Sequence, residues 1–194
     1  MISATDAAEH LSAGQIVVVP TDTTYGIAAD PTRRSTIATV FDVKGRPLDK
    51  PLPLLADCPQ SLDGIAVWDS PTRKVFEAFW PGPLTLVLER ADGYTHDLGG
   101  ASASIAVRVP AHAITLEILR LTGPLAVTSA NRSGDRPALS VSEARGALEP
   151  SIQHFVDGGV CDGVPSTVVS LTGHPKLLRA GPVPFEEVLQ ALSL

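Results

Sequence analysis

The sequence has little cysteine, few aromatic residues and no long apolar run, and each shortage excludes a class of protein. Its two cysteines, Cys58 and Cys161, lie far apart and form neither a disulfide framework nor a metal-binding spacing, so a reduced, cytoplasmic setting is expected. The longest apolar runs, "IVVV" and "LTLVL", are much shorter than the ~20 residues of a membrane span. No secretory leader is recognisable either, so no membrane association is predicted.

An excess of positive charge is also missing. The formal net charge is −6, which argues against a chain that coats nucleic acid through its overall charge. Aromatic residues make up only 5% of the chain, so few stacking platforms for single-stranded bases are available. The basic residues do cluster, however, with Lys44, Arg46 and Lys50 in one short stretch. A local basic cleft therefore stays possible.

What the sequence does contain is a pattern of short strands and helices. Hydrophobic residues make up 44% of it, which is enough for a real core, and no internal repeat or linker divides residues 1–194, so a single domain is predicted. Because several neighbouring strands are joined by short turns, we expect an α/β protein of the α+β type with a twisted mixed β-sheet flanked by helices. The expected helices are 5–12, 32–43, 70–79, 113–121, 142–148 and 185–192, and the expected strands are 15–19, 25–29, 52–56, 83–89, 104–110, 124–131, 154–159, 166–172 and 176–181. Thr32 and Ser70 are expected to cap the second and third of these helices.

Polar clusters stand at the ends of four expected strands, in "PTDTTYG", "VRVPAH", "VTSANRSG" and "GVPSTVVS". Ligands of mixed α/β sheets bind at strand ends and in the turns that follow them. A fifth cluster, "KGRPLDK", must be a loop and supplies positive charge suited to phosphates. The residues therefore indicate a polar, partly basic cleft for a phosphate-bearing small molecule.

Several residues allow a second interpretation. Arg108 lies in the apolar strand "IAVRVP", where it either faces solvent by alternation or binds an anion. Asp22 could bind a metal or close a local turn, and "SAN" could be turn chemistry. Lys44 and Arg46 could form an ordinary solvated loop. The five histidines are scattered without a ligand spacing.

Taken together, the ordered motifs resemble the YrdC-like family of threonylcarbamoyl-AMP synthases. The motifs are "PTDTTYGIAADP", "KGRPLDKPL", "FWPGPLTLVL", "VRVPAH", "SANRSG", "DGG…STVV" and "LLRAG", and they run from about Ile16 to Gly181. The resemblance implies the synthesis of threonylcarbamoyl-AMP from L-threonine, bicarbonate and ATP, with Mg²⁺ accompanying the ATP and pyrophosphate released. The product would serve the N6-threonylcarbamoyl modification of adenosine 37 in tRNA, together with other threonylcarbamoylation proteins.

The resemblance also implies roles for ten residues of this chain. Four would contact threonine, five would contact ATP, and two basic residues would stabilise the charge that develops on the phosphates. The threonine contacts are Thr23, Arg108, Ser129 and Ser166; the ATP contacts are Arg46, Lys50, Ser104, Asn131 and Arg179; the catalytic pair is Lys44 and Arg46.

The chain departs from the family pattern at three places, and at the first of them Thr24 stands where the family usually has valine. Leu55 stands where longer relatives carry a histidine, and Leu139 stands near the position of a nucleotide-contacting threonine. Two alternatives to the synthase remain: a module that binds structured RNA and assists ribosome maturation without catalysis, and an enzyme that handles another carbamoyl adenylate. The second is disfavoured because the accompanying zinc-finger and acylphosphatase-like segments are not seen in the sequence.

Overall fold

The computed structural model describes residues 1–100 and 103–193, and all ten candidate site residues lie in that part. The helices are α1 (Ala4–Ser12), α2 (Arg34–Lys44), the 3₁₀ helix η1 (Pro59–Leu62), α3 (Ser70–Phe79), α4 (Ala113–Thr122), α5 (Val141–Leu148) and α6 (Phe185–Ser193). The strands are β1 (Val17–Val19), β2 (Gly26–Ala29), β3 (Leu54–Leu55), β4 (Ala66–Val67), β5 (Leu84–Arg90), β6 (Ser104–Arg108), β7 (Leu125–Ser129), β8 (His154–Phe155), β9 (Thr167–Ser170) and β10 (Lys176–Arg179). Within the described ranges no helix has the length and apolar character needed to cross a membrane.

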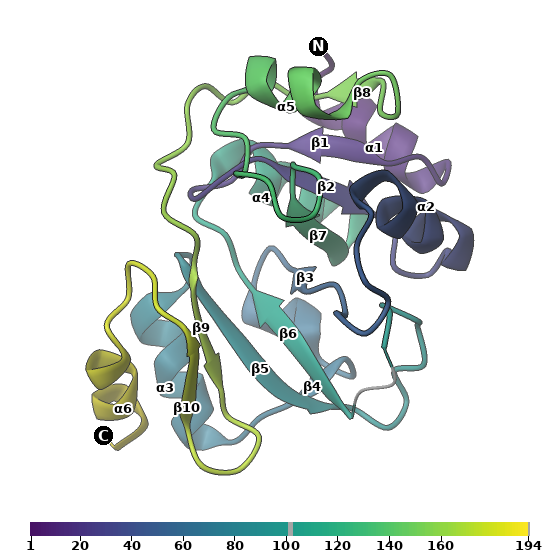
Figure 1. The fold of residues 1–194 in the computed structure, drawn as a ribbon. Coiled ribbons are helices and arrows are strands. Elements are labelled where there is room, and N and C mark those ends of the chain that lie inside the picture. The colour runs from purple at the N-terminus through teal and green to yellow at the C-terminus, as the bar shows by residue number, and fades with distance from the viewer. Residues whose placement is uncertain (101–102, 194) are drawn as a thin grey trace.

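The strands form one mixed sheet, as the sequence predicts. Nine strands follow the order β10-β9-β5-β6-β3-β7-β2-β1-β8, and β4 pairs with β5 outside this path. Three pairings, β1 with β8, β3 with β6 and β5 with β9, are parallel, and the others are antiparallel. The two-residue strand β3 lies between β6 and β7, so it joins two halves of the sheet (Figure 1).

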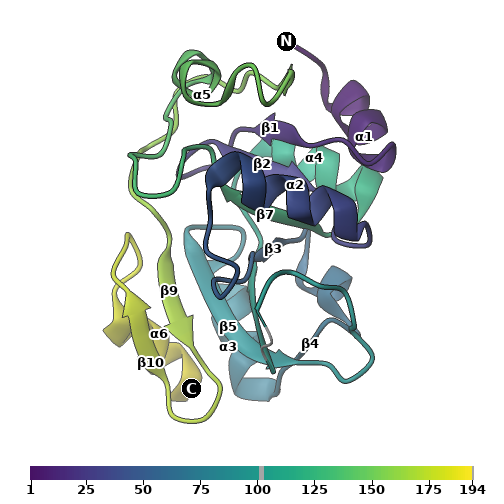
Figure 2. The same cartoon turned by 45° about the vertical axis from the view of Figure 1, so that its right-hand side comes forward.

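Alternation along the strands assigns each side chain to one face of the sheet. In the first half, Val17 and Val19 pack with α1 and α4, whereas Val18 belongs to the larger core that includes α2. In the second half, residues of β5 and β6 share this core with residues of α3 and α6. Figure 2 shows α3 behind this part of the sheet. Helices α1 and α4 contact each other, as do α3 and α6. The other face of β5, β6 and β9 does not pack against the helices of this core. The half-buried side chains of Ala106 and Val168 lie on that face.

Two local predictions are wrong, and capping explains both. Thr32 does not cap α2, because its hydroxyl and amide donate to Asp30 in a turn before the helix, and the N-cap position falls to Arg33. Ser70 does not cap α3, because the Asp69 side chain accepts from the Thr72 amide instead. A carboxylate is among the best acceptors at that position.

The end of α2 differs from the sequence prediction by one residue, and this decides where Lys44 lies. The helix includes Lys44, which the sequence placed in the loop, and stops at Gly45. Gly45 has φ +60°, a left-handed conformation that glycine adopts without the penalty of a side chain. The chain therefore turns sharply between Lys44 and Arg46, and their side chains leave in different directions.

Candidate active site

A cavity of about 320 Å³ lies where the two halves of the sheet meet. Three guanidinium groups face it, and hydroxyl groups and apolar side chains make up most of the remaining wall. None of the described residues that line it is acidic. The charged and hydroxyl-bearing residues are Arg46, Arg108, Arg179, Thr21, Thr23, Thr24, Tyr25, Thr85, Thr128, Ser129 and Ser166, and the apolar wall includes Leu55, Ala106, Val127 and Val168.

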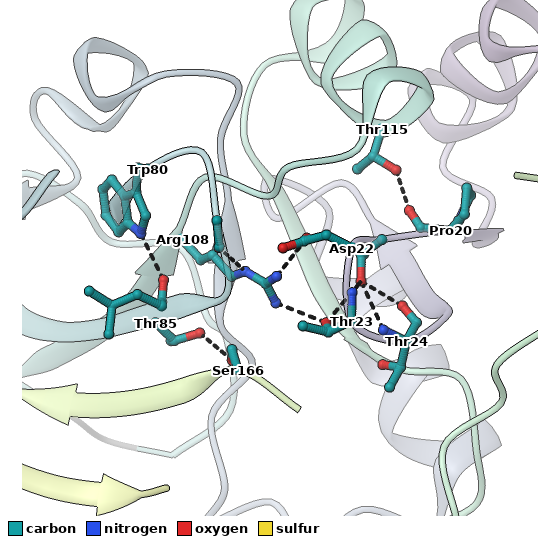
Figure 3. Close-up of polar contacts among 12 residues, drawn as sticks. Pro20, Asp22, Thr23, Thr24, Trp80, Thr85, Arg108, Thr115 and Ser166 are labelled. Atoms are coloured by element: carbon teal, nitrogen blue, oxygen red, sulfur yellow. Dashed lines mark hydrogen bonds and ion pairs between the residues drawn. The ribbon is translucent and has the colours of Figure 1, made fainter. Parts of the chain in front are cut away.

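The threonines of "PTDTTYG" shape the loop between β1 and β2. The Thr21 hydroxyl oxygen accepts from the amides of Thr23 and Thr24, each at 3.1 Å, and donates to the Thr24 carbonyl at 2.6 Å (Figure 3). The Thr115 hydroxyl of α4 donates to the Pro20 carbonyl and fixes the start of the loop. These bonds give the backbone groups of the buried turn hydrogen-bond partners within the turn itself. Thr23 faces the cavity.

Arg108 is buried beside this loop. Its Nη2 lies 2.6 Å from Asp22 Oδ1, its Nη1 donates to the Thr23 hydroxyl at 3.1 Å, and its Nε donates to the Gly82 carbonyl at 2.9 Å. Burial lowers the pKa of Arg108, and the Asp22 carboxylate opposes that shift. A guanidinium has five N–H groups, so one remains on each Nη. Arg108 can therefore still bind a carboxylate with both terminal nitrogens.

The pairing with Asp22 decides between the two interpretations of Arg108. The residue does not face solvent, since it is only 6% exposed, and it lines the cavity. Asp22 itself pairs with Arg108, so it is an ion-pair partner and not the acceptor of a local turn. This pair could not be predicted from the sequence, because the two residues are far apart in the chain.

The opposite wall comes from β5, β9 and β10. The Arg179 Nε and Nη2 both donate to the Ser166 carbonyl, and Nη2 also reaches the Ser166 hydroxyl at 3.0 Å. Burial lowers the pKa of Arg179, and the nearby charge of Arg108 lowers it further. The Ser166 hydroxyl lies 2.8 Å from that of Thr85, a buried polar residue that sequence analysis missed (Figure 3). The sequence feature that could have identified Thr85 is its position as the one polar residue in the apolar run "LTLVL".

The three basic residues of "KGRPLDK" lie in different surroundings. Arg46 lines the cavity, and its Nε and Nη2 donate to the carbonyls of Lys50 and Pro51 at 2.8 and 3.1 Å. Burial lowers the pKa of Arg46. Lys50 is exposed and is not among the lining residues. Lys44 is only 3% exposed, and it is not among the lining residues either.

Three other candidates lie beside the cavity and not in its wall. Asn131 is 6% exposed and donates its side-chain amide to the carbonyls of Arg132 and Asp135. Ser104 begins β6 and shares a strand face with Ala106 and Arg108, so a ligand that extends along β6 would reach it. Leu139 lies beside Gly163 and is absent from the lining, whereas Leu55 contributes to the apolar wall.

Six of the predicted residues thus meet around one cavity: Thr23, Arg46, Arg108, Ser129, Ser166 and Arg179. Three converging arginines without a lining carboxylate define a site for a small anionic ligand at the strand ends of a mixed sheet. The family model described as "Telomere recombination", for the Sua5, YciO and YrdC proteins, matches residues 9–181. The chain belongs to this family.

Named relatives and solved structures agree with that assignment. A Mycobacterium tuberculosis protein, provisionally named a threonylcarbamoyl-AMP synthase, is 39% identical over 188 residues, which are 95% of this chain and 86% of the relative. The threonylcarbamoyl-AMP synthase of Bacillus subtilis is 33% identical over 187 residues, 94% of this chain and 54% of its own length. This chain therefore spans about half of that longer relative.

The fold is that of solved family members. The structure of Pyrococcus abyssi Sua5 complexed with L-threonine superposes with a TM-score of 0.92 at 35% identity, covering 97% of this chain and 56% of Sua5. Escherichia coli YciO superposes with a TM-score of 0.85 at 23% identity, covering 93% of this chain and 90% of YciO, and it is similar in fold alone.

Proposed function

We propose that this protein is a threonylcarbamoyl-AMP synthase that joins L-threonine, bicarbonate and ATP. The observation that carries the proposal is the composition of the cavity wall: three arginines and a set of hydroxyls line it, in a chain whose formal net charge is −6. Such a wall suits ligands with carboxylate and phosphate oxygens. The names of the relatives supply the particular reaction.

The arrangement suggests where each substrate binds. Arg108 has an N–H left on each terminal nitrogen, so it would hold the threonine carboxylate, beside the hydroxyl of Thr23. The apolar side chains of Leu55 and Val127 would accommodate the threonine methyl group. Arg46 and Arg179 would face the phosphates of ATP, with Ser129 and Ser166 between the two substrates.

The reaction needs no covalent bond between the enzyme and a substrate. The threonine nitrogen forms a bond to the carbon of CO₂, which bicarbonate supplies with loss of water, and the amine gives up its proton to solvent. An oxygen of the resulting carbamate then attacks the α-phosphorus, and the bond to the bridging oxygen breaks as pyrophosphate leaves. Holding the reactants in line supplies about 7–11 kcal/mol of the barrier in favourable cases. Arginine side chains would stabilise the charge that develops on the phosphates.

Mg²⁺ would enter as part of the substrate, bound to ATP. Among residues 1–100 and 103–193 there is no cluster of three acidic, histidine or cysteine side chains that could hold a metal. The cavity wall offers hydroxyls and guanidinium groups instead. The phosphates and water would therefore hold the ion, and the protein side chains would bind the phosphate oxygens that the ion leaves free.

The product would pass to enzymes that modify adenosine 37 of tRNA, in the cytoplasm. The alternative of an RNA-binding module has less support, because the arginines face a single cavity whose volume suits small molecules. An extended basic surface would be needed to follow an RNA backbone.

The test is threonine-dependent release of pyrophosphate by the purified protein. With Mg²⁺-ATP, bicarbonate and L-threonine, we expect pyrophosphate and an adenylate that carries threonine. L-Serine should react about 10- to 200-fold less efficiently, because it lacks one methyl group. Equal consumption of ATP without any amino acid would show that the proposal is wrong, and the reaction without bicarbonate serves as the second blank.

A further inference from the structure

Lys44 lies in a cage of protein acceptors, away from the cavity that its neighbour Arg46 faces. Its Nζ donates to the Ser129 carbonyl at 2.5 Å, to the Asn131 carbonyl at 2.7 Å and to the Asn131 side-chain oxygen at 3.3 Å. An ammonium group has three N–H donors, so these acceptors occupy all of them. In this arrangement no donor is left for a phosphate oxygen.

The main chain of Lys44 binds the same segment. The Ser133 amide donates to the Lys44 carbonyl at 2.7 Å, so the last residue of α2 contacts residues 129–133 with both its side chain and its backbone. The two parts of Lys44 thereby fix the turn in which β7 ends. Burying an ammonium is costly unless acceptors satisfy it, and here the acceptors all belong to this one turn.

The turn that Lys44 holds carries two residues that the family resemblance places at the ligands. Ser129 lines the cavity, and the Asn131 amide contacts the carbonyls of Arg132 and Asp135. The same turn also meets the first motif, because the Ala130 amide donates to the Tyr25 carbonyl at 2.7 Å. A change at Lys44 would therefore move Ser129 relative to Thr23, and both of these residues line the cavity.

We infer that Lys44 is a positioning residue, which sets the geometry of Ser129 and Asn131, and that it does not bind the substrate phosphates. The choice of threonine as the ligand to be tested rests on the proposed function. The hydrogen bonds by which Lys44 holds residues 129–133 do not depend on it. Each residue of "KGR" then has a different role: Arg46 would bind the substrate, Gly45 turns the chain, and Lys44 holds the neighbouring turn. A direct phosphate contact and a positioning role make different predictions for ligands that carry no phosphate.

The test compares wild type, Lys44→Met and Lys176→Met without nucleotide. Methionine keeps most of the length of lysine and removes its donors, and Lys176, an exposed residue of β10, is the matched control. Hydrogen–deuterium exchange followed by mass spectrometry would report on peptides covering 129–138, and titration calorimetry would measure L-threonine binding. Loss of hydrogen bonds to a charged group is expected to speed exchange and weaken threonine binding by about 10- to 100-fold in Lys44→Met. Lys176→Met should match wild type in both measurements.

The outcomes separate this inference from the proposed function. Unchanged exchange over 129–138 in a folded Lys44→Met protein would overturn the inference, as would unchanged threonine affinity when wild type binds threonine. If wild type itself fails to bind threonine, the proposed function is overturned, and the exchange data alone decide whether Lys44 holds the turn.

A measurement on wild type covers the case in which Lys44→Met does not fold. Lys44 is the only buried lysine of the four in the chain, so its ammonium protons should exchange slowly enough to give a ¹H–¹⁵N signal without ligand. That signal should stay in place when inorganic pyrophosphate is added. A large shift, or no signal until pyrophosphate is present, would show a direct phosphate contact and overturn the inference.

Discussion

Arg108 Nη2 and Asp22 Oδ1 lie 2.6 Å apart, although the two residues are separated by 86 positions in the sequence. The side chains are only 8% and 12% exposed. The pair joins β6, in one half of the sheet, to the loop between β1 and β2 in the other half. It therefore fixes the distance across the cavity as well as the direction of the Arg108 guanidinium.

The first prediction concerns this pair. Replacing Asp22→Asn leaves a buried guanidinium without its counter-ion, which costs about 3 kcal/mol of unfolding free energy. The apparent KM for threonine should also rise, because Arg108 loses the group that orients it. Urea unfolding of the variant measures the first effect. The control is Asp92→Asn, an exposed aspartate whose change should stay within about 0.5 kcal/mol. If both variants unfold at the same urea concentration as wild type, the pair has no structural role.

A second prediction concerns Arg46. The Arg46→Ala change should leave the fold intact, because the side chain bonds only to carbonyls of its own loop. Turnover should fall by at least ~100-fold, the scale seen when one preorganised charge-stabilising donor is lost. Arg46→Lys should recover part of this, since an ammonium cannot reproduce the fork of the guanidinium. Pyrophosphate release and a thermal melt are the measurements.

The matched control for Arg46 is Arg34→Ala, because the Arg34 side chain is 88% exposed at the start of α2. That variant should keep wild-type turnover. Near-normal turnover in an Arg46→Ala protein that melts normally would remove Arg46 from the site.

The third prediction is a pH dependence that originates at Lys44. Burial lowers the pKa of Lys44 from 10.5 to about 8, and the charge of Arg46 acts in the same direction. Between about pH 8 and 10.5 the unfolded chain then binds more protons at this residue than the folded one, so the contribution of Lys44 to stability rises with pH. Below pH 8 the full cost of burying the charge is present.

The difference in unfolding free energy between wild type and Lys44→Met isolates this effect. It should shift in favour of wild type by up to ~1.4 kcal/mol per pH unit as the pH rises from 8 to 10. Other groups titrate equally in both proteins and cancel. A difference that stays constant across this range would contradict the lowered pKa.

The fourth prediction compares the two tyrosines of the chain. The Tyr25 hydroxyl donates to the Gly159 carbonyl at 2.8 Å and accepts from the Gly158 amide at 3.1 Å, so it ties the first motif to the segment that leads to Ser166. Tyr25→Phe should lower the unfolding free energy by about 1–3 kcal/mol, because it removes two hydrogen bonds made by a fully buried side chain. Thermal or urea unfolding provides the measurement.

Tyr94→Phe is the natural control for Tyr25→Phe. The Tyr94 hydroxyl is buried and has no hydrogen-bond partner among the described residues, and burial raises its pKa to about 12. Removing that oxygen should be neutral or slightly stabilising. An equal loss of stability in the two variants would refute the role given to the Tyr25 hydroxyl.

Most of the secondary structure could be predicted from the sequence, because apolar periodicity and glycine or proline positions act locally. The mixed sheet, the six α-helices and the loop character of residues 45–51 all followed from such patterns. The two-residue strand β4 and the 3₁₀ helix η1 did not, because they are too short to show a period. The two N-cap residues were each misplaced by one position, where neighbouring polar side chains compete for the same amides.

The sequence by itself determined that polar residues follow buried strands, and its ordered motifs indicated a family and a set of site residues. Only the tertiary structure decided what each of them faces. Arg46 faces the cavity and Lys44 faces a turn of the protein, because one left-handed glycine separates them. Arg108 has Asp22 as its counter-ion because the sheet brings β6 beside the loop between β1 and β2. Such partners are set by long-range packing, and no local pattern of residue types encodes them.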